Sequence, residues 1–161
     1  MSLQIRPAMV HDRWDICQLH LESWKTTYKH DVYKHMLETV FPTEMEKQLA
    51  ARIFSDPEVV LVAVENQLNG FVFALTDQDA PLIENLHVRP GIQSRDVGAH
   101  LLKTVLQELS ARGFQKANLE VLETNHRARD FYTRMGGQDF GECTGTLFGK
   151  TVAERRFEFD L

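Results

Sequence analysis

Residues 86–102, LHVRPGIQSRDVGAHLL, join a short apolar run, a Pro-Gly break, a polar loop and the start of an amphipathic helix. The first N–H groups of a helix have no partner within the helix, and they lie at the positive end of its dipole. They can hold an anion, and a pyrophosphate suits them because each N–H can bind one oxygen. Gly98 would let the backbone approach closely, and Gln93, Ser94 and Arg95 could add donors. The alternative is an ordinary strand-to-helix connection with a polar cap.

A candidate general base lies in the preceding run, LIENLHV. Strict β alternation places Glu84 on the same face as Leu82, Leu86 and Val88. A carboxylate among apolar neighbours is partly desolvated, which would raise its pKa toward a useful range. A solvated or bulged strand residue is an equally good interpretation. Glu120 in NLEVLE is the second candidate by the same alternation argument.

Three further polar residues have both a chemical and a structural interpretation. Tyr132 lies on the apolar face of the predicted last helix, where its hydroxyl needs a partner, so it is a candidate acid or a core tyrosine. His87 alternates to the face opposite Glu84, and a lone strand histidine is more often structural. Asn125 is a typical helix N-cap, and it could also bind a ligand.

Three motifs in register resemble the GNAT superfamily of N-acetyltransferases. The family's acyl-CoA-binding pattern is Gln or Arg, two residues, Gly, one residue, then Gly or Ala. Gln93, Asp96 and Gly98 stand at these places. The family's second signature is matched by Asn125, Ala128, Phe131, Tyr132 and Gly136, and its N-terminal strand and helix by IRPAMVHDRWDICQLHLESWKTTY with Trp24 and Tyr28. The resemblance spans nearly the whole chain.

The resemblance implies an acetyl-CoA-dependent N-acetyltransferase that moves an acetyl group directly to a primary amine in a ternary complex. It implies Tyr132 as the acid near the thioester sulfur, Glu84 as the base and the Val88 N–H as the donor to the carbonyl. The cofactor-binding residues that it implies are Leu86, His87, Val88, Gln93, Ser94, Arg95, Asp96, Val97, Gly98, Ala99, Asn125 and Tyr132.

The same resemblance places the amine beside Trp24, Tyr28 and Glu84. Trp24 also lies at helical spacing from Ile16, which favours a core position slightly. Neither cysteine stands in a matching motif position, which disfavours a covalent acetyl-enzyme. A domain of the same fold that binds acyl-CoA without catalysis is the alternative, and the absence of Walker A and GxGxxG motifs ranks another nucleotide-binding fold last.

Asp96 departs from the family pattern, which has glycine there. A carboxylate within about 5 Å of a pyrophosphate would weaken binding by about 1 kcal/mol. We expect that acetyl-CoA still binds, because the backbone N–H of residue 96 can point at the phosphate whatever its side chain does.

The elements that must position these residues follow from periodicity. The predicted helices are Asp12 to about Tyr28 with Asp12 as cap, Val32 to Thr39 ended by Pro42, and Thr43 to about Phe54 with a capping box of Thr43 and Glu46. Predicted strands follow in EVVLVAVEN, FVFALTD and PLIENLHV, and Asn69-Gly70 between the first two is a turn signal.

The second half of the chain alternates between helix and strand. Residues 95–112 predict a helix capped by Gly113, KANLEVLE a strand, and NHRARDFYTRM a helix closed by Gly136-Gly137. QDFGECTG and KTVAERRFEFD predict two final strands. The fold class is therefore α/β, a GNAT-like mixed, mostly antiparallel sheet flanked by helices, in the order β-α-α-β-β-β-α-β-α-β-β.

Bulk composition is that of one globular domain over residues 1–161, with 43% hydrophobic and 25% charged residues and a net charge of −5. The charge argues against nucleic acid as a partner and mildly favours cationic ones. We expect no membrane span and no signal peptide, and the two cysteines predict a reduced cytoplasmic setting. The irregular spacing of His11, His20, His30 and His35 predicts no metal site, and a homodimer could form through the C-terminal strand.

Overall fold

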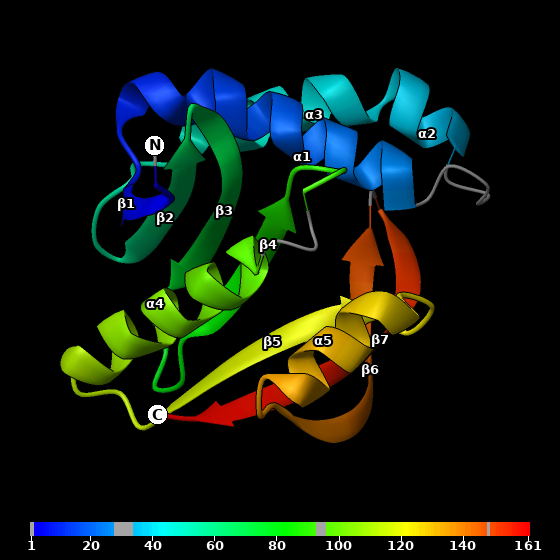
Figure 1. The fold of residues 1–161 in the computed structure, drawn as a ribbon. Helices are drawn as coiled ribbons and strands as arrows, with labels where there is room; N and C mark the ends of the chain where they lie inside the picture. Colours follow the sequence, from blue (N-terminus) through cyan, green and yellow to red (C-terminus); the bar gives the residue numbers. More distant parts are fainter. Residues whose placement is uncertain (1, 28–33, 93–95, 148) are drawn as a thin grey trace.

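A seven-stranded sheet in the order β1-β2-β3-β4-β5-β7-β6 forms the centre of the computed structural model, which describes residues 2–27, 34–92, 96–147 and 149–161 (Figure 1). Only β4 and β5 pair in parallel, and the other neighbours are antiparallel. The strands are β1 (Gln4–Pro7), β2 (Glu58–Glu65), β3 (Gln67–Leu75), β4 (Leu82–Val88), β5 (Lys116–Leu122), β6 (Gln138–Leu147) and β7 (Lys150–Asp160).

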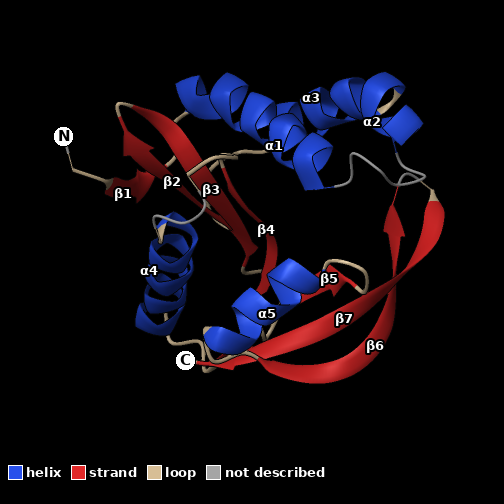
Figure 2. Ribbon diagram, turned by 45° about the vertical axis from the view of Figure 1, so that its right-hand side comes forward, coloured by secondary structure: helices blue, strands red, loops and turns tan. Residues whose placement is uncertain are grey.

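Helices cover both faces of the sheet, which confirms the predicted fold class (Figure 2). They are a short 3-10 turn (Val10–Asp12), α1 (Arg13–Thr27), α2 (Lys34–Thr39), α3 (Phe41–Ala51), α4 (Val97–Ala111) and α5 (His126–Arg134). Three α-helices precede β2, as the three predicted helical segments indicate, whereas the predicted element order counted only two. One core lies between the sheet and α4 and α5, and a second lies between the sheet and α1 and α3. We call these two faces the α4 face and the α1 face.

The ends of α4 and α5 are where the sequence predicts them. Gly113 follows α4 with φ 93°, and the N–H of Phe114 donates to the C=O of Leu109 at 3.2 Å, as in a Schellman end. The side chain of Asn125 caps α5 by accepting the N–H of Ala128 at 3.2 Å. Gly136 takes φ 95° just beyond the helix. The N-cap interpretation of Asn125 is confirmed.

The predicted N-terminal caps of α1 and α3 are wrong. Asp12 is buried inside the 3-10 turn, where it pairs with Arg6 at 2.8 Å and accepts the N–H of Met9 at 2.7 Å. Helix α3 begins at Phe41, so Pro42 starts a helix instead of ending one, as its fixed φ and missing N–H allow. Thr43 therefore lies inside α3, where its side chain cannot form a capping box.

Asn69-Gly70 is not the turn between β2 and β3. The two strands reverse at Asn66, which has φ 64°, and the register runs from Glu65↔Gln67. Gly70 lies within β3, and a Cβ there would meet Leu101 Cδ1 at 2.8 Å. The glycine thus serves the close approach of α4 to the sheet, not a turn.

The C-terminal strand lies inside the sheet. Strand β7 pairs with β5 on one edge and with β6 on the other, which leaves β6 as the outer strand among those described. Because both edges of β7 are already paired, a dimer cannot form by pairing through a free edge of this strand. A homodimer as such stays a prediction.

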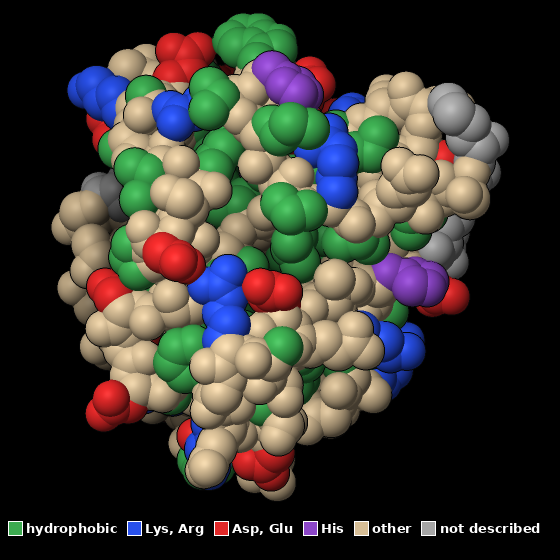
Figure 3. All heavy atoms as spheres, turned by 90° about the vertical axis from the view of Figure 1, so that its left-hand side faces the viewer, with side chains coloured by type: hydrophobic (Ala, Val, Ile, Leu, Met, Phe, Trp, Pro, Cys, Tyr) green, Lys and Arg blue, Asp and Glu red, His purple; other side chains and the backbone are tan. Residues whose placement is uncertain are grey.

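The face of the molecule on the left of Figure 1 carries acidic and basic side chains interspersed, with hydrophobic side chains gathered over its upper half (Figure 3). No helix within the described ranges is both long enough and apolar enough to cross a lipid bilayer.

Candidate active site

Strands β4 and β5 are paired over only the first part of their length. Their parallel ladder joins Leu82 to Asn118 and Ile83 to Leu119, and β4 then continues to Val88 without β5 beside it. The main-chain groups on this edge of β4 have therefore lost their strand partner. Such a separation in the middle of a sheet exposes polar backbone that a ligand can bind.

The N–H of Val88 points into this separation. Arg89 donates its N–H to the C=O of Asn69 on β3 at 2.8 Å, and Val88 stands opposite Gly70. Because residues of an antiparallel ladder alternate in the edge to which their N–H points, the N–H of Val88 faces away from β3. The predicted carbonyl donor therefore lies where the two strands have parted.

Helix α4 begins beside the same end of β4. A Cβ on Gly98 would lie 3.4 Å from Val88 Cγ2, 3.7 Å from Leu86 Cδ2 and 3.5 Å from Phe131 Cζ of α5. The start of α4, the end of β4 and helix α5 thus meet at one point. The first N–H groups of α4, which include those of Val97, Gly98 and Ala99, are the orphan donors of this helix.

Asp96 precedes α4 in the left-handed conformation, with φ 59° and ψ 14°. Its exposed side chain does not cap the helix, and its C=O accepts the N–H of His100 at 2.9 Å. Left-handed backbone is the conformation that glycine adopts without steric penalty, which explains the family's preference for glycine here. The predicted donors Gln93, Ser94 and Arg95 lie outside the described residues.

Glu84 does not share a face with Leu86 and Val88, because β4 contains a bulge. Opposite β3, Phe73 pairs with Asn85 and Ala74 with Ile83, so Glu84 is the extra residue. Ile83 and Leu86 both pack in the core of the α4 face although they are three positions apart along the strand. The bulge reverses the alternation, so the predicted apolar surroundings of Glu84 are wrong.

The carboxylate of Glu84 instead lies on the α1 face and forms an ion pair with the guanidinium of Arg52, which is also 5.0 Å from the centre of the Phe73 ring. The side chain of Glu84 keeps 26% of its surface exposed. Arg52 also bonds Glu58 at 3.3 Å. Glu84 is therefore partly accessible and charge-paired.

His87 shares the α1 face with Glu84, contrary to the alternation argument. Its Nδ1 lies 2.9 Å from the hydroxyl of Ser23 on α1, and its ring lies 4.3 Å from that of His20. Burial lowers the pKa of His87 from 6.5 to about 4. Burial also holds the pKa of His20 well below its usual range, with His87 and Arg52 adding to the shift. Both rings are therefore neutral near pH 7.

Trp24 belongs to this histidine cluster. Its indole N–H donates to His20 Nε2 at 2.9 Å, and its ring lies 4.9 Å from that of Phe41 in the core of the α1 face. The core interpretation of Trp24 therefore holds, while its contact with substrate stays a prediction. Tyr28 lies outside the described residues.

Tyr132 is buried in the core of the α4 face with only 8% of its surface exposed. Its ring lies 5.3 Å from that of Phe131 and 5.9 Å from that of Phe157. Because Phe131 also contacts the Gly98 position, Tyr132 lies on the helix that borders the strand separation.

Glu120, the second candidate base, lies on β5 and pairs with Arg156 of β7 at 2.9 Å. The neighbouring Glu154 was not among the candidates that the sequence analysis identified. Burial and the charge of Glu120 raise the pKa of Glu154. The sequence analysis did not identify Arg52 either, because its partner Glu84 is far away in sequence and no local motif marks the pair.

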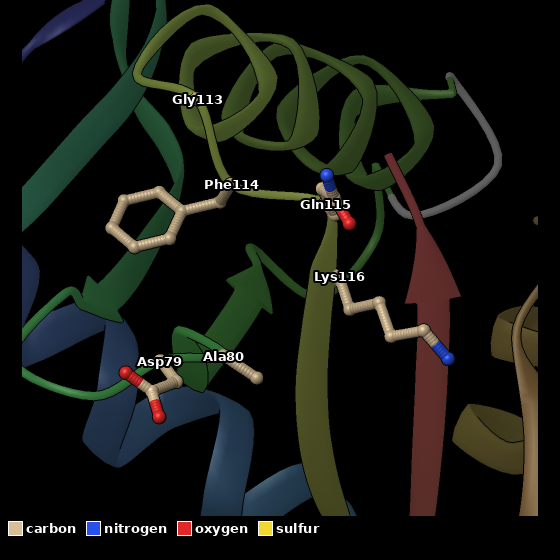
Figure 4. Close-up of a pocket in the computed structure, with 6 residues that line it drawn as sticks. All are labelled: Asp79, Ala80, Gly113, Phe114, Gln115 and Lys116. Carbon is tan, nitrogen blue, oxygen red and sulfur yellow. The ribbon is translucent and has the colours of Figure 1, made fainter.

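A hollow at the opposite end of β4 and β5 is separate from these residues (Figure 4). It is lined by Asp79, Ala80, Gly113, Phe114, Gln115 and Lys116. None of the predicted site residues lines it, and in Figure 4 the side chain of Lys116 points away toward β7.

Comparison with known proteins supports the geometric interpretation. Residues 14–137 match the model of the acetyltransferase (GNAT) family. The thialysine N-epsilon-acetyltransferase of Bos taurus is 32% identical over 63 residues, which is 39% of this chain and 37% of that protein. The Sus scrofa protein of the same name is 29% identical with the same coverage. The match thus spans little more than a third of these relatives.

Solved structures share the whole fold. The PaiA N-acetyltransferase of Thermoplasma acidophilum, in complex with coenzyme A, superimposes with a TM-score of 0.76 at 18% identity over 100% of both chains. A GCN5-related N-acetyltransferase of Rhodopseudomonas palustris superimposes with a TM-score of 0.81 at 21% identity, over 100% of this chain and 97% of that one.

Proposed function

Since this chain belongs to the acetyltransferase (GNAT) family, we propose that it transfers an acetyl group from acetyl-CoA directly to a primary amine within a ternary complex. The observation that carries the proposal is the parting of β4 from β5 beside the start of α4, with the N–H of Val88 turned into the opening.

The described residues fit acetyl-CoA as co-substrate. The orphan N–H groups of Val97, Gly98 and Ala99 would bind the pyrophosphate, and Gly98 lies between β4 and α5, where even a Cβ would already be in contact with Val88 at 3.4 Å. The backbone of residues 86–88 would bind the pantetheine arm along the unpaired edge of β4. Asn125 would add a side-chain contact from the start of α5.

The chemistry requires that a C–N bond forms and a C–S bond breaks. Glu84 takes a proton from the ammonium so that the neutral amine can attack, with Glu120 or water as the alternatives. The N–H of Val88 stabilises the oxyanion that develops on the thioester carbonyl. Tyr132 donates its proton to the departing thiolate of coenzyme A, and the second proton of the amine nitrogen leaves to water or returns to the Tyr132 oxygen.

Both cysteines support direct transfer over a covalent acetyl-enzyme. A thiol attacks as its thiolate, so a raised pKa disfavours it as a nucleophile. Burial and the charge of Glu46 raise the pKa of Cys17, and burial with Glu120 and Glu154 raises that of Cys143. Both are free thiols, which also agrees with the reduced cytoplasmic location that we propose.

Glu84 and Glu120 reach the α1 face near the strand separation, which suits an amine that arrives as a cation. The relatives of Bos taurus and Sus scrofa are named for acetylation of thialysine, which supports a primary amine as the acceptor here. Trp24, Tyr28 and Glu84 are the residues that we propose beside it.

The first experiment is calorimetric titration of the purified protein with acetyl-CoA at two salt concentrations. We expect micromolar binding that salt weakens, as for a bound pyrophosphate. An amine panel should then contain peptide N-termini, lysine, polyamines, amino sugars and small amino acids, with release of coenzyme A thiol as the readout.

Tyr132→Phe separates catalysis from binding in the same assay. We expect kcat to fall about a hundredfold with unchanged acetyl-CoA affinity, because the ring and its packing remain. If the wild-type protein binds acetyl-CoA but releases no thiol when an amine is added, the non-catalytic acyl-CoA-binding domain is favoured. Failure to bind acetyl-CoA would overturn the proposed function.

A further inference from the structure

The bulge leaves the orientation of Glu84 to its side-chain partners. Because Glu84 is the extra residue opposite Ala74 and Phe73, the β3 ladder does not hold it in register. A base must nevertheless be aimed at the reacting amine, since a displacement of about 1 Å can reduce the rate about a hundredfold. Another group must therefore fix this carboxylate.

Arg52 is the group that contacts it. The guanidinium of Arg52 donates to Glu84 Oε2, and the two side chains keep 19% and 26% of their surfaces exposed. A pair so shielded from water is held more strongly than a surface pair.

Arg52 is itself held before any substrate arrives. It bonds Glu58 Oε1 at 3.3 Å and lies over the ring of Phe73. Glu58 is in turn fixed by the N–H groups of Ile53 and Phe54, at 3.0 and 3.2 Å. The guanidinium therefore has little freedom to lose when it orients Glu84.

The end of α3 is anchored from a second side. Arg13 of α1 donates to the C=O of Leu49 at 3.2 Å, of Ala50 at 2.8 Å and of Arg52. Leu49 and Ala50 lie in the last turn of α3, whose carbonyls lack partners within the helix, and Arg52 follows the helix as its C-cap. The backbone of Arg52 is thus fixed to α1, and its side chain reaches from there to β4.

We infer that Arg52 is the positioning residue of the base, because it holds the Glu84 carboxylate in place from outside the sheet. The inference rests on the proposed function, in which Glu84 accepts the proton. Arg52 acts through Glu84 and touches neither acetyl-CoA nor the reacting atoms.

The test is a double-mutant cycle on kcat with Arg52→Gln, Glu84→Gln and the double variant. We expect Arg52→Gln to lower kcat roughly ten- to a hundredfold and to leave KM for acetyl-CoA unchanged. In the Glu84→Gln background, Arg52→Gln should lower kcat by less than about a further twofold, because the carboxylate that Arg52 positions is already gone. Arg52→Lys keeps the charge and should recover part of the loss.

The matched control is Arg112→Gln at the far end of α4. Arg112 also pairs with two carboxylates, Asp56 at 2.6 Å and Glu108 at 3.1 Å, and neither of them is Glu84. Its loss should leave kcat unchanged. If Arg52→Gln does not fold, Glu58→Gln loosens the same guanidinium without removing it and should give a smaller loss of kcat in the same pattern.

Two results overturn this inference while the proposed function stands. One is an active wild type in which the losses from Arg52→Gln and Glu84→Gln multiply, since Arg52 would then be structural. The other is Glu84→Gln with the activity of the wild type, since Arg52 would then have no base to position. A wild type without amine-dependent thiol release overturns the proposed function and this inference with it.

Discussion

At the scale of single residues, Asp96 combines a left-handed backbone, which disfavours side chains, with a negative charge, which disfavours a bound anion. It holds φ 59° at the place where the family pattern has glycine. Left-handed backbone disfavours most side chains, although Asp and Asn tolerate it better than others. Its carboxylate also precedes the helix start at which we propose that the pyrophosphate binds. The same residue thus affects both the backbone of the loop and its affinity for an anion.

Asp96→Gly should raise the affinity for acetyl-CoA about fivefold, which corresponds to about 1 kcal/mol. Asp96→Asn should give a similar gain, because it removes the charge and keeps a side chain that tolerates left-handed backbone. The measurement is calorimetric titration at low and high salt, and the gain should shrink as salt screens the repulsion.

The pair of variants separates charge from conformation. A gain with Gly but not with Asn would assign the effect to the backbone of residue 96. A lower affinity of Asp96→Gly would show that the carboxylate does not repel the cofactor.

At the scale of elements, the position of α5 depends on close contacts at Gly137, the residue that joins it to β6. Gly137 links α5 to β6, and a Cβ there would lie 2.8 Å from Phe159 Cζ and 2.9 Å from the C=O of Tyr132. Its N–H also donates to that carbonyl at 2.9 Å. A larger residue would therefore push α5, with Tyr132 on it, away from β7.

Gly137→Ala should lower the free energy of unfolding by about 1–3 kcal/mol, because neither the backbone oxygen nor the buried ring can move freely. Urea denaturation measures the change. Gly98→Ala is the comparison, since its Cβ would meet side chains at 3.4 Å and beyond and gains helix propensity. Equal destabilisation by the two variants would contradict the argument from close approach.

At the scale of the whole molecule, the two neutral histidines on the α1 face link stability to pH. Burial lowers the pKa of His87 from 6.5 to about 4, and burial also holds the pKa of His20 well below its usual range. Between the histidine pKa values of the folded and the unfolded chain, the unfolded chain binds more protons than the folded one. The free energy of unfolding therefore rises with pH across this range.

We expect the contribution of His87 to be fully present above pH 6.5 and to be lost as pH falls toward 4. The loss should amount to about 2–3 kcal/mol. Denaturant titrations at pH 7, 6 and 5 measure it, and His87→Phe should flatten the dependence. An equally steep dependence in His87→Phe would show that other groups cause it.

The sequence by itself predicted most of the elements, the family and the kind of site that we propose. The Asn125 cap, Gly113 and Gly136 act on their own neighbours, so spacing alone places the ends of α4 and α5. Three motifs in register were enough to indicate the family and the acetyl-CoA site. These features are local, or they are repeated along the chain in a fixed order.

Only the tertiary structure decided which groups surround Glu84, the base that we propose. Alternation cannot reveal that Glu84 is a bulge residue, since the bulge exists only relative to β3. Nor could it place His87 on the face of Glu84, or Arg52 beside its carboxylate. The position of β7 inside the sheet likewise depends on partners far away in sequence. Spacing encodes the conformation of a segment, whereas its partners are chosen by how all segments bury their surfaces together.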